Sequence, residues 1–366
     1  MINFSEPYQS YKENKSAFDR VIIKTLTDGS YILGENVKRF EKNFSNYLNI
    51  RHSIAVANGT DAIHLGLRSL NIGKGDEVIV PSHTAIGTVY AVEMSGAKVV
   101  FADIEKDFFT IDPKSIKKKI TKKTKAIICV HLYGQSCDLK NIVKLAKNNN
   151  LSLIEDCSQA HGAKYQRKKV GNFGTLSCFS LYPTKNLGAF GDAGIITTNN
   201  KKIAKKLKLL RQYGWNENRK SQHMGWNSRM DEIQAAILNI KIKKLDFNNK
   251  RRKEIAKIYN QNLNIKHIQV PKIRNVNDHV FYLYVIKCKK RNQLRSFLKK
   301  KKICTGVHYF KPVHKEKIYI KRRINLEETE KISKEILSLP CYPELKLKDQ
   351  KKIINLTKSF FNNNYF

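Results

Sequence analysis

Long apolar runs are missing from this sequence, and none approaches the roughly 20 residues that a helix needs to cross a bilayer. The first eight residues, Met-Ile-Asn-Phe-Ser-Glu-Pro-Tyr, also lack the basic segment followed by an apolar one that marks a secretory signal. These absences argue against a membrane-inserted or exported chain. We therefore expect a cytoplasmic protein.

Paired cysteine spacings are absent as well. The seven cysteines are an odd number, and they lie far apart and mostly inside apolar runs: Cys129, Cys137, Cys157, Cys178, Cys288, Cys304 and Cys341. This pattern favours reduced, buried thiols over a disulfide framework. Cys304, His308 and His314 carry metal-ligating groups, but no paired ligand set accompanies them, so we expect no metal site.

Acidic residues are few, with 31 Asp and Glu against 69 Lys and Arg and a formal net charge of +38. Such an excess can indicate binding to nucleic acid or to an anionic membrane. However, the sequence has no aromatic-plus-basic RNA motif and no Gly-Lys-Ser/Thr loop, and its lysines are spread through expected helices such as 117–119, 201–208 and 299–302. We interpret the charge as mainly solvated surface that helps to attract an anionic substrate. A basic nucleic-acid-binding protein is the alternative from a different class.

Repeats and low-complexity linkers are absent too, and short apolar runs alternate with segments of helical spacing. The runs are 53–56, 78–80, 99–101, 126–130, 151–154, 176–180 and 195–198. This alternation predicts an α/β fold with a mainly parallel sheet covered by helices. The length of 366 residues suits a large domain over 1–246 and a smaller C-terminal α/β domain over 247–366.

The region around this boundary is expected to be helical. A long helix over 231–244 is predicted because Ile233, Ala236 and Ile240 share one face, with Ser228 and Asp231 as its capping box. Later segments read as a helix over 248–261, a strand over 279–286, and helices over 294–298 and 329–337.

Lys185 differs from the other lysines because it is the only basic residue between Val170 and Asn200. An amine surrounded by apolar and glycine residues loses hydration, which disfavours its charged form. A lysine that is neutral part of the time is a nucleophile that forms a Schiff base with an aldehyde or ketone. The alternative is a lysine that extends from a loop into solvent.

Two strand ends carry chemistry that matches such a lysine. Ligands of open α/β sheets bind beyond the carboxyl ends of the strands. After 53–56, the segment Asn58-Gly-Thr-Asp offers glycine and free helix-start amides to a phosphate, although it also suits an ordinary turn and N-cap. After 151–154, Asp156 emerges from a buried strand and needs a cationic or hydrogen-bonding partner, unless it is an N-cap.

Pyridoxal phosphate requires the three features that this chain offers. It needs a Schiff-base lysine, an acid opposite its ring nitrogen and an anion site for its phosphate. Lys185, Asp156 and the turn at residues 58–61 supply these features in a single predicted sheet.

Six longer motifs share these positions. They are Asn58-Gly-Thr-Asp-Ala, Pro81-Ser-His-Thr, Glu155-Asp-Cys-Ser-Gln-Ala-His-Gly-Ala, Tyr182-Pro-Thr-Lys-Asn-Leu-Gly, Gly191-Asp-Ala-Gly and Gly225-Trp-Asn-Ser-Arg-Met-Asp-Glu-Ile-Gln-Ala-Ala. Together they resemble the DegT/DnrJ/EryC1/StrS family of nucleotide-sugar aminotransferases, over residues 20 to 345. The resemblance implies the type I, aspartate aminotransferase-like fold of pyridoxal phosphate enzymes, and a homodimer with active sites at the subunit interface.

The resemblance also implies roles for individual residues. Lys185 would hold pyridoxal phosphate and shuttle the proton, and Asp156 would pair with the pyridinium nitrogen. The remaining cofactor contacts would come from Gln159 at the ring hydroxyl, from Gly59, Thr60, Asp61 and Ser180 at the phosphate, and from Asn227 at the phosphate of the neighbouring subunit. Many relatives have a stacking aromatic residue where Ala85 stands, so His83 is the candidate for that face, with a structural histidine as the alternative.

The implied reaction is a two-stage transamination in which L-glutamate is the amino donor and a keto-sugar is the acceptor. The segments Arg211-Gln-Tyr-Gly-Trp and Thr305-Gly-Val-His-Tyr resemble those of enzymes that aminate C3 of dTDP-3-keto-6-deoxyhexoses. On that resemblance Tyr182, His308 and Tyr309 are candidates to bind the sugar, with packing or loop roles as their alternatives. The competing interpretation is an aminotransferase for a 4-keto nucleotide sugar. A dehydratase of the same fold is disfavoured, because such enzymes lack the lysine.

Overall fold

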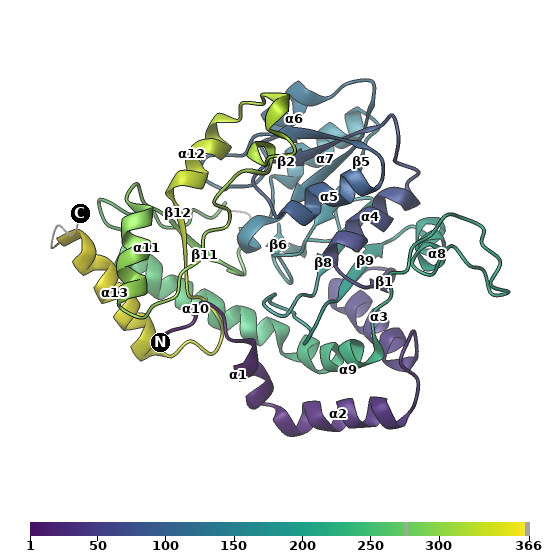
Figure 1. Ribbon diagram of the computed structural model, residues 1–366, viewed down its shortest axis with the longest axis horizontal. Helices are drawn as coiled ribbons and strands as arrows, with labels where there is room; N and C mark the ends of the chain where they lie inside the picture. Colours follow the sequence, from purple (N-terminus) through teal and green to yellow (C-terminus); the bar gives the residue numbers. More distant parts are fainter. Residues whose placement is uncertain (275–276, 363–366) are drawn as a thin grey trace.

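A seven-stranded sheet lies at the centre of the computed structural model, which describes residues 1–274 and 277–362 (Figure 1). The strand order is β1-β9-β8-β5-β4-β2-β3, and β9 runs antiparallel to both of its neighbours, whereas the other pairs are parallel. The strands are β1 (His52–Val56), β2 (Glu77–Pro81), β3 (Lys98–Ala102), β4 (Thr124–Val130), β5 (Ser152–Asp156), β8 (Leu176–Ser180) and β9 (Gly194–Thr198). Each apolar run that was predicted as a strand falls in this sheet, so the mainly parallel α/β prediction is confirmed.

Helices cover both faces of the sheet. One face packs against α4 (Gly59–Ser69), α5 (Ile86–Met94) and α8 (Lys201–Leu210), and the other against α3 (Glu35–Leu48), α6 (Pro113–Lys119), α7 (Leu139–Asn148) and α9 (Glu232–Lys241). Neighbouring strand residues therefore enter different cores: Ile54 joins the first and Ala55 the second. Burial on both faces explains why these strands are continuous apolar runs.

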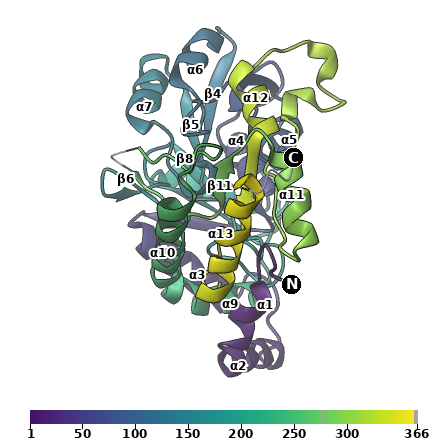
Figure 2. The same ribbon diagram turned by 90° about the vertical axis from the view of Figure 1, so that its left-hand side faces the viewer.

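The C-terminal part builds a third core beside the sheet. Its strands β11 (Tyr284–Lys287) and β12 (Ile336–Leu339) pair antiparallel. Around them lie α10 (Leu245–Leu263), α11 (Arg291–Lys300), α12 (Glu327–Glu335) and α13 (Leu347–Asn362), and α10 runs beside α13 (Figure 2). The expected boundary at residue 246 falls inside α10, so one helix continues across it. The division into two domains stays a prediction.

The remaining elements lie outside these layers. They are α1 (Pro7–Lys12), α2 (Lys15–Thr27), the small sheet of β6 (Lys164–Tyr165), β7 (Lys168–Lys169) and β10 (Asn277–Asp278), and the 3₁₀ turns η1 (Leu132–Gly134), η2 (Ile242–Lys244), η3 (Val313–Lys315) and η4 (Ile320–Arg322). All seven cysteines are free thiols and all but Cys304 are buried, as predicted. Within the described residues, no helix has the length and apolar character of a membrane span.

Three local predictions were wrong. The segment over 279–286 is a strand only in its last part, because β11 begins at Tyr284. The helix predicted over 329–337 ends at Glu335, because Ile336 and Leu337 pair with β11 instead. Ser228 forms no capping box for α9, since its hydroxyl accepts the Ala57 backbone N–H at 3.1 Å. In the last two cases a contact with a distant segment replaces the local pattern.

Candidate active site

A cavity of about 480 Å³ opens where the parallel strands end. Its walls come from the ends of β4, β5 and β8 and from the starts of α4 and α5. Eight residues predicted for the site line it: Gly59, Thr60, Asp61, Asp156, Gln159, Ser180, Tyr182 and Lys185. The cavity therefore lies where ligands of open α/β sheets bind.

One wall of the cavity is the start of α4. The Asn58 side chain caps this helix by accepting the Asp61 backbone N–H at 2.8 Å. The first N–H groups of a helix have no intrahelical partner, and they favour an anion together with the helix dipole. Gly59 is needed here, because a Cβ at this position would lie 2.6 Å from the Ser180 Cβ. The helix start and the Ser180 hydroxyl thus form one narrow cradle.

The Asp156 carboxylate lies on the cavity wall and is held from two sides. It is 3% exposed. Its Oδ2 accepts the Thr88 hydroxyl at 2.8 Å and its Oδ1 accepts the Ser158 backbone N–H at 3.0 Å. Turns follow Asp156 in the chain, so the N-cap interpretation is wrong. Thr88 reaches Asp156 from α5, and no local pattern in the sequence predicts this pairing.

Lys185 follows β8 in a turn, in which its backbone N–H donates to the Tyr182 carbonyl at 2.9 Å. Its Nζ lies 4.6 Å from the centre of the Tyr282 ring, which comes from the C-terminal part. Burial alone would raise the pKa of Tyr282, but the Lys185 charge and the Thr184 hydroxyl outweigh it, and the pKa is lowered. Tyr282 was not predicted, because it lies far from Lys185 in the sequence.

Gln159 is oriented at both ends of its amide. Its Oε1 accepts the Tyr133 backbone N–H at 2.8 Å, and its Nε2 donates to the Tyr309 hydroxyl at 3.0 Å. His83 is buried beside these tyrosines, 2.7 Å from the Tyr133 hydroxyl through its Nε2. Burial lowers the pKa of His83 to about 3, so its imidazole is neutral at ordinary pH. These aromatic side chains support Gln159 from behind the cavity wall.

Four predicted site residues are not part of the cavity lining: His83, Asn227, His308 and Tyr309. His308 stacks on Phe4 with ring centres 5.4 Å apart, and its Nδ1 lies 2.9 Å from the Ser338 hydroxyl. Asn227 is exposed and pairs through its backbone with Gln212. It belongs to the segment over 212–227, which extends away from the body of the molecule after α8 (Figure 1).

Comparisons with known proteins identify the family of this chain. The model of the DegT/DnrJ/EryC1/StrS aminotransferase family matches residues 12–358. A dTDP-3-amino-3,6-dideoxy-alpha-D-galactopyranose transaminase from Aneurinibacillus thermoaerophilus is 43% identical, over 98% of this chain and 99% of the relative. A dTDP-3-amino-3,4,6-trideoxy-alpha-D-glucose transaminase from Streptomyces venezuelae is 37% identical, over 98% of this chain and 96% of the relative. The crystal structure of S. venezuelae DesV superposes with a TM-score of 0.96 at 37% identity, covering 98% of both chains. The chain belongs to the DegT/DnrJ/EryC1/StrS aminotransferase family.

Proposed function

We propose that this chain is a pyridoxal-phosphate-dependent aminotransferase that converts a dTDP-3-keto-6-deoxyhexose into the dTDP-3-amino-3,6-dideoxyhexose, with L-glutamate as amino donor. The observation that carries the proposal is the joint placement of Lys185, Asp156 and the α4 cradle around one cavity. The relatives at 43% and 37% identity are named for amino groups at C3 of dTDP-sugars, which supports the position of amination.

The residues present fit pyridoxal phosphate. The start of α4 and Ser180 line the cavity together, and Gly59 lets them approach so closely that an added Cβ would lie 2.6 Å from the Ser180 Cβ; free N–H groups at such a helix start suit a phosphate. The buried Asp156 carboxylate suits a cationic ring nitrogen, because a buried charge requires a partner. When bound, the group supplies an aldehyde for the lysine and a ring that withdraws electrons from the reacting carbon.

Lys185 then has two tasks in this proposal. Its Nζ would hold the cofactor at rest. Once released, it would move the proton from the α-carbon of the amino donor to the cofactor, and in the second stage it would move a proton from the cofactor to the sugar carbon that gains the nitrogen. The Tyr282 ring faces this amine and limits where it can move. Asp156, fixed by Thr88 and Ser158, keeps the opposite side of the site negative through both stages.

The sugar is proposed to contact Tyr182, His308 and Tyr309. Tyr182 lines the cavity and is 51% exposed, which suits contact with an incoming substrate. Tyr309 and His308 are consecutive, and Tyr309 reaches the site through Gln159. The strongly positive chain attracts the anionic nucleotide sugar.

We further propose a cytoplasmic homodimer whose subunits complete each other's sites. Asn227 is the residue expected to reach the partner's phosphate. Its segment exposes apolar side chains, with Met224 at 85% and Trp226 at 46% exposure. Exposed apolar patches of this kind are typical of interaction surfaces.

Isotope transfer tests the proposed reaction. Protein supplied with pyridoxal phosphate, ¹⁵N-glutamate and a dTDP-3-keto-6-deoxyhexose should release 2-oxoglutarate and place ¹⁵N on C3 of the sugar, as read by NMR. The 4-keto isomer is the matched control and should stay unlabelled. Labelling of the 4-keto isomer alone would contradict C3 amination, and no labelling of either sugar would contradict the proposed function.

A further inference from the structure

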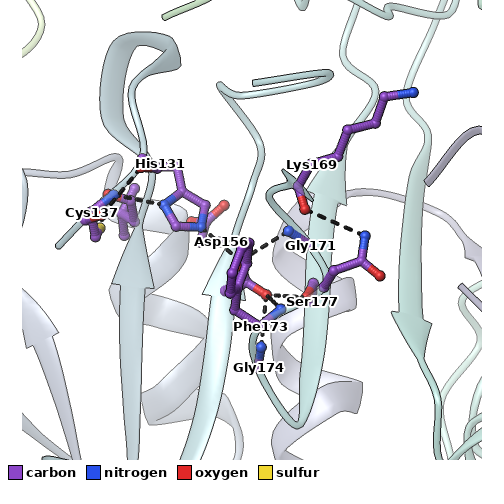
Figure 3. A network of polar contacts seen from close by, with 12 residues as sticks. His131, Cys137, Asp156, Lys169, Gly171, Phe173, Gly174 and Ser177 are labelled. Atoms are coloured by element: carbon purple, nitrogen blue, oxygen red, sulfur yellow. Dashed lines mark hydrogen bonds and ion pairs between the residues drawn. The ribbon is translucent and has the colours of Figure 1, made fainter. Parts of the chain in front are cut away.

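Glu155 is a fully buried carboxylate that the proposed reaction does not use, although it directly precedes Asp156 in β5. Five hydrogen bonds converge on it, and Figure 3 labels the residues that donate them: His131, Gly171, Phe173, Gly174 and Ser177. Oε1 accepts the backbone N–H groups of Phe173 at 2.7 Å and Gly174 at 2.8 Å and the Ser177 hydroxyl at 3.1 Å; Oε2 accepts the Gly171 N–H at 2.9 Å and His131 Nε2 at 3.0 Å.

The network fixes the protonation of its members. His131 Nδ1 accepts the Cys137 backbone N–H at 3.1 Å, so the ring proton lies on Nε2 and is donated to Glu155. Burial alone would raise the pKa of Glu155, but the His131 hydrogen bond and the backbone donors outweigh it, and the pKa lies below its ordinary value. Glu155 is therefore an anion whose two oxygens face donors only. Both His131 nitrogens are thus engaged in hydrogen bonds within this network.

Three of the donors lie in the loop before β8, and the other two belong to segments next to the cavity. His131 directly follows β4, and its backbone N–H donates to the Asp156 carbonyl at 3.0 Å. Ser177 lies in β8, which ends at Ser180. The Ser180 N–H in turn donates to the Ser158 hydroxyl at 3.1 Å. Glu155 thus joins the end of β4, through His131, to the loop that leads into β8 and to the first part of β8, through Ser177.

We propose that Glu155 is a positioning residue for Asp156, holding the end of β5 in place through its hydrogen bonds to His131, to the loop before β8 and to Ser177. This inference rests on the proposed function, because its readout is cofactor binding. Glu155 itself touches neither cofactor nor substrate.

Glu155→Gln tests the clamp because it keeps the shape of the side chain. Its amide NH₂ must replace one oxygen and then faces at least two donors, so the network has to rearrange. We expect about tenfold weaker binding of pyridoxal phosphate to the apoenzyme, as for the loss of one charge-assisted hydrogen bond. The rate constant of the glutamate stage in single turnover of the fully loaded enzyme should fall as well. This constant does not depend on the fraction of folded protein, so a purely structural role would leave it unchanged.

Glu232→Gln is the matched control. Glu232 is also a buried carboxylate, 1% exposed, and accepts the N–H groups of Asn36 at 2.8 Å and Val37 at 2.9 Å, but it is not part of the cavity lining. It should lose thermal stability while keeping cofactor affinity. Ser177→Ala removes only one of the five donors to Glu155. It should also weaken the binding of pyridoxal phosphate, but by less than Glu155→Gln does.

The outcomes separate the two proposals. A wild-type protein that binds no pyridoxal phosphate contradicts the proposed function. If the wild-type protein binds pyridoxal phosphate and Glu155→Gln binds it with the same affinity and has the same single-turnover rate constant, the proposed role of Glu155 is overturned. If Glu155→Gln does not fold, Ser177→Ala decides: unchanged affinity and rate in that variant overturn the inference.

Discussion

Thr88→Val isolates the support that α5 gives to Asp156. Thr88 is 4% exposed and its hydroxyl donates to Asp156 Oδ2 at 2.8 Å. Valine has nearly the same shape, so the change removes the donor and leaves the packing. A hydrogen bond to a charged group contributes about 1.5–3 kcal/mol. If this orientation is needed in the transition state, the rate constant should fall by about tenfold to a hundredfold.

Stopped-flow measurement of the glutamate stage, at saturating cofactor, gives this constant directly. Thr357→Val is the control, because Thr357 is equally buried and its hydroxyl donates to the Ile353 carbonyl in α13 at 2.7 Å. It should cost stability without changing the rate constant. If the Thr88→Val rate constant stays within about twofold of the wild-type value, the decrease is much smaller than this hydrogen bond predicts, and the reasoning is refuted.

Three further results are expected. Lys185→Ala should lose both transamination and the borohydride-reducible cofactor adduct, and mass spectrometry that still finds an adduct on this variant would place the covalent site elsewhere. Burial alone would raise the pKa of Glu330, but hydrogen bonds from Lys315 and His314 outweigh it and lower the pKa to about 2. The stabilisation by Glu330 should therefore be present above its unfolded pKa and be lost as pH falls towards 2, so urea unfolding of wild type and Glu330→Gln should converge in acid; a difference that does not depend on pH would contradict this. Mixing inactive Lys185→Ala with Asn227→Ala should restore activity. In a hybrid dimer one site combines the intact Lys185 of one subunit with the intact Asn227 of the other. No gain of activity on mixing would contradict the role of Asn227 across the interface.

The sequence was sufficient for the parts of the site that follow strand ends. Gly59, Asp156 and Ser180 each come at or just after an apolar run, and parallel strands bring such ends to one edge. The local pattern of Lys185 was equally clear, since no other cation lies near it in the chain. The order of strands in the sheet then gathers these residues around one cavity.

The supporting residues could not be found in this way. Thr88 and Tyr282 act through contacts with residues far away in the sequence, and neither has a distinctive neighbourhood of its own. The wrong end of α12 has the same origin. Ile336 continues the helical spacing and its N–H still donates to the Ile332 carbonyl, but its backbone is extended and the chain from Ile336 to Leu339 pairs with β11, which overrides local preference.

The contact between Lys185 and Tyr282 means that the surroundings of the proposed nucleophile come from two distant parts of the chain. A fragment that ends at residue 246 would retain the phosphate cradle and Asp156, yet it would present Lys185 to bulk water on the side that the phenol now covers. Exchanging the C-terminal third between relatives would therefore alter the surroundings of the proposed nucleophile. A chimaera that retains Tyr282 together with β11 keeps the aromatic ring over the Lys185 amine.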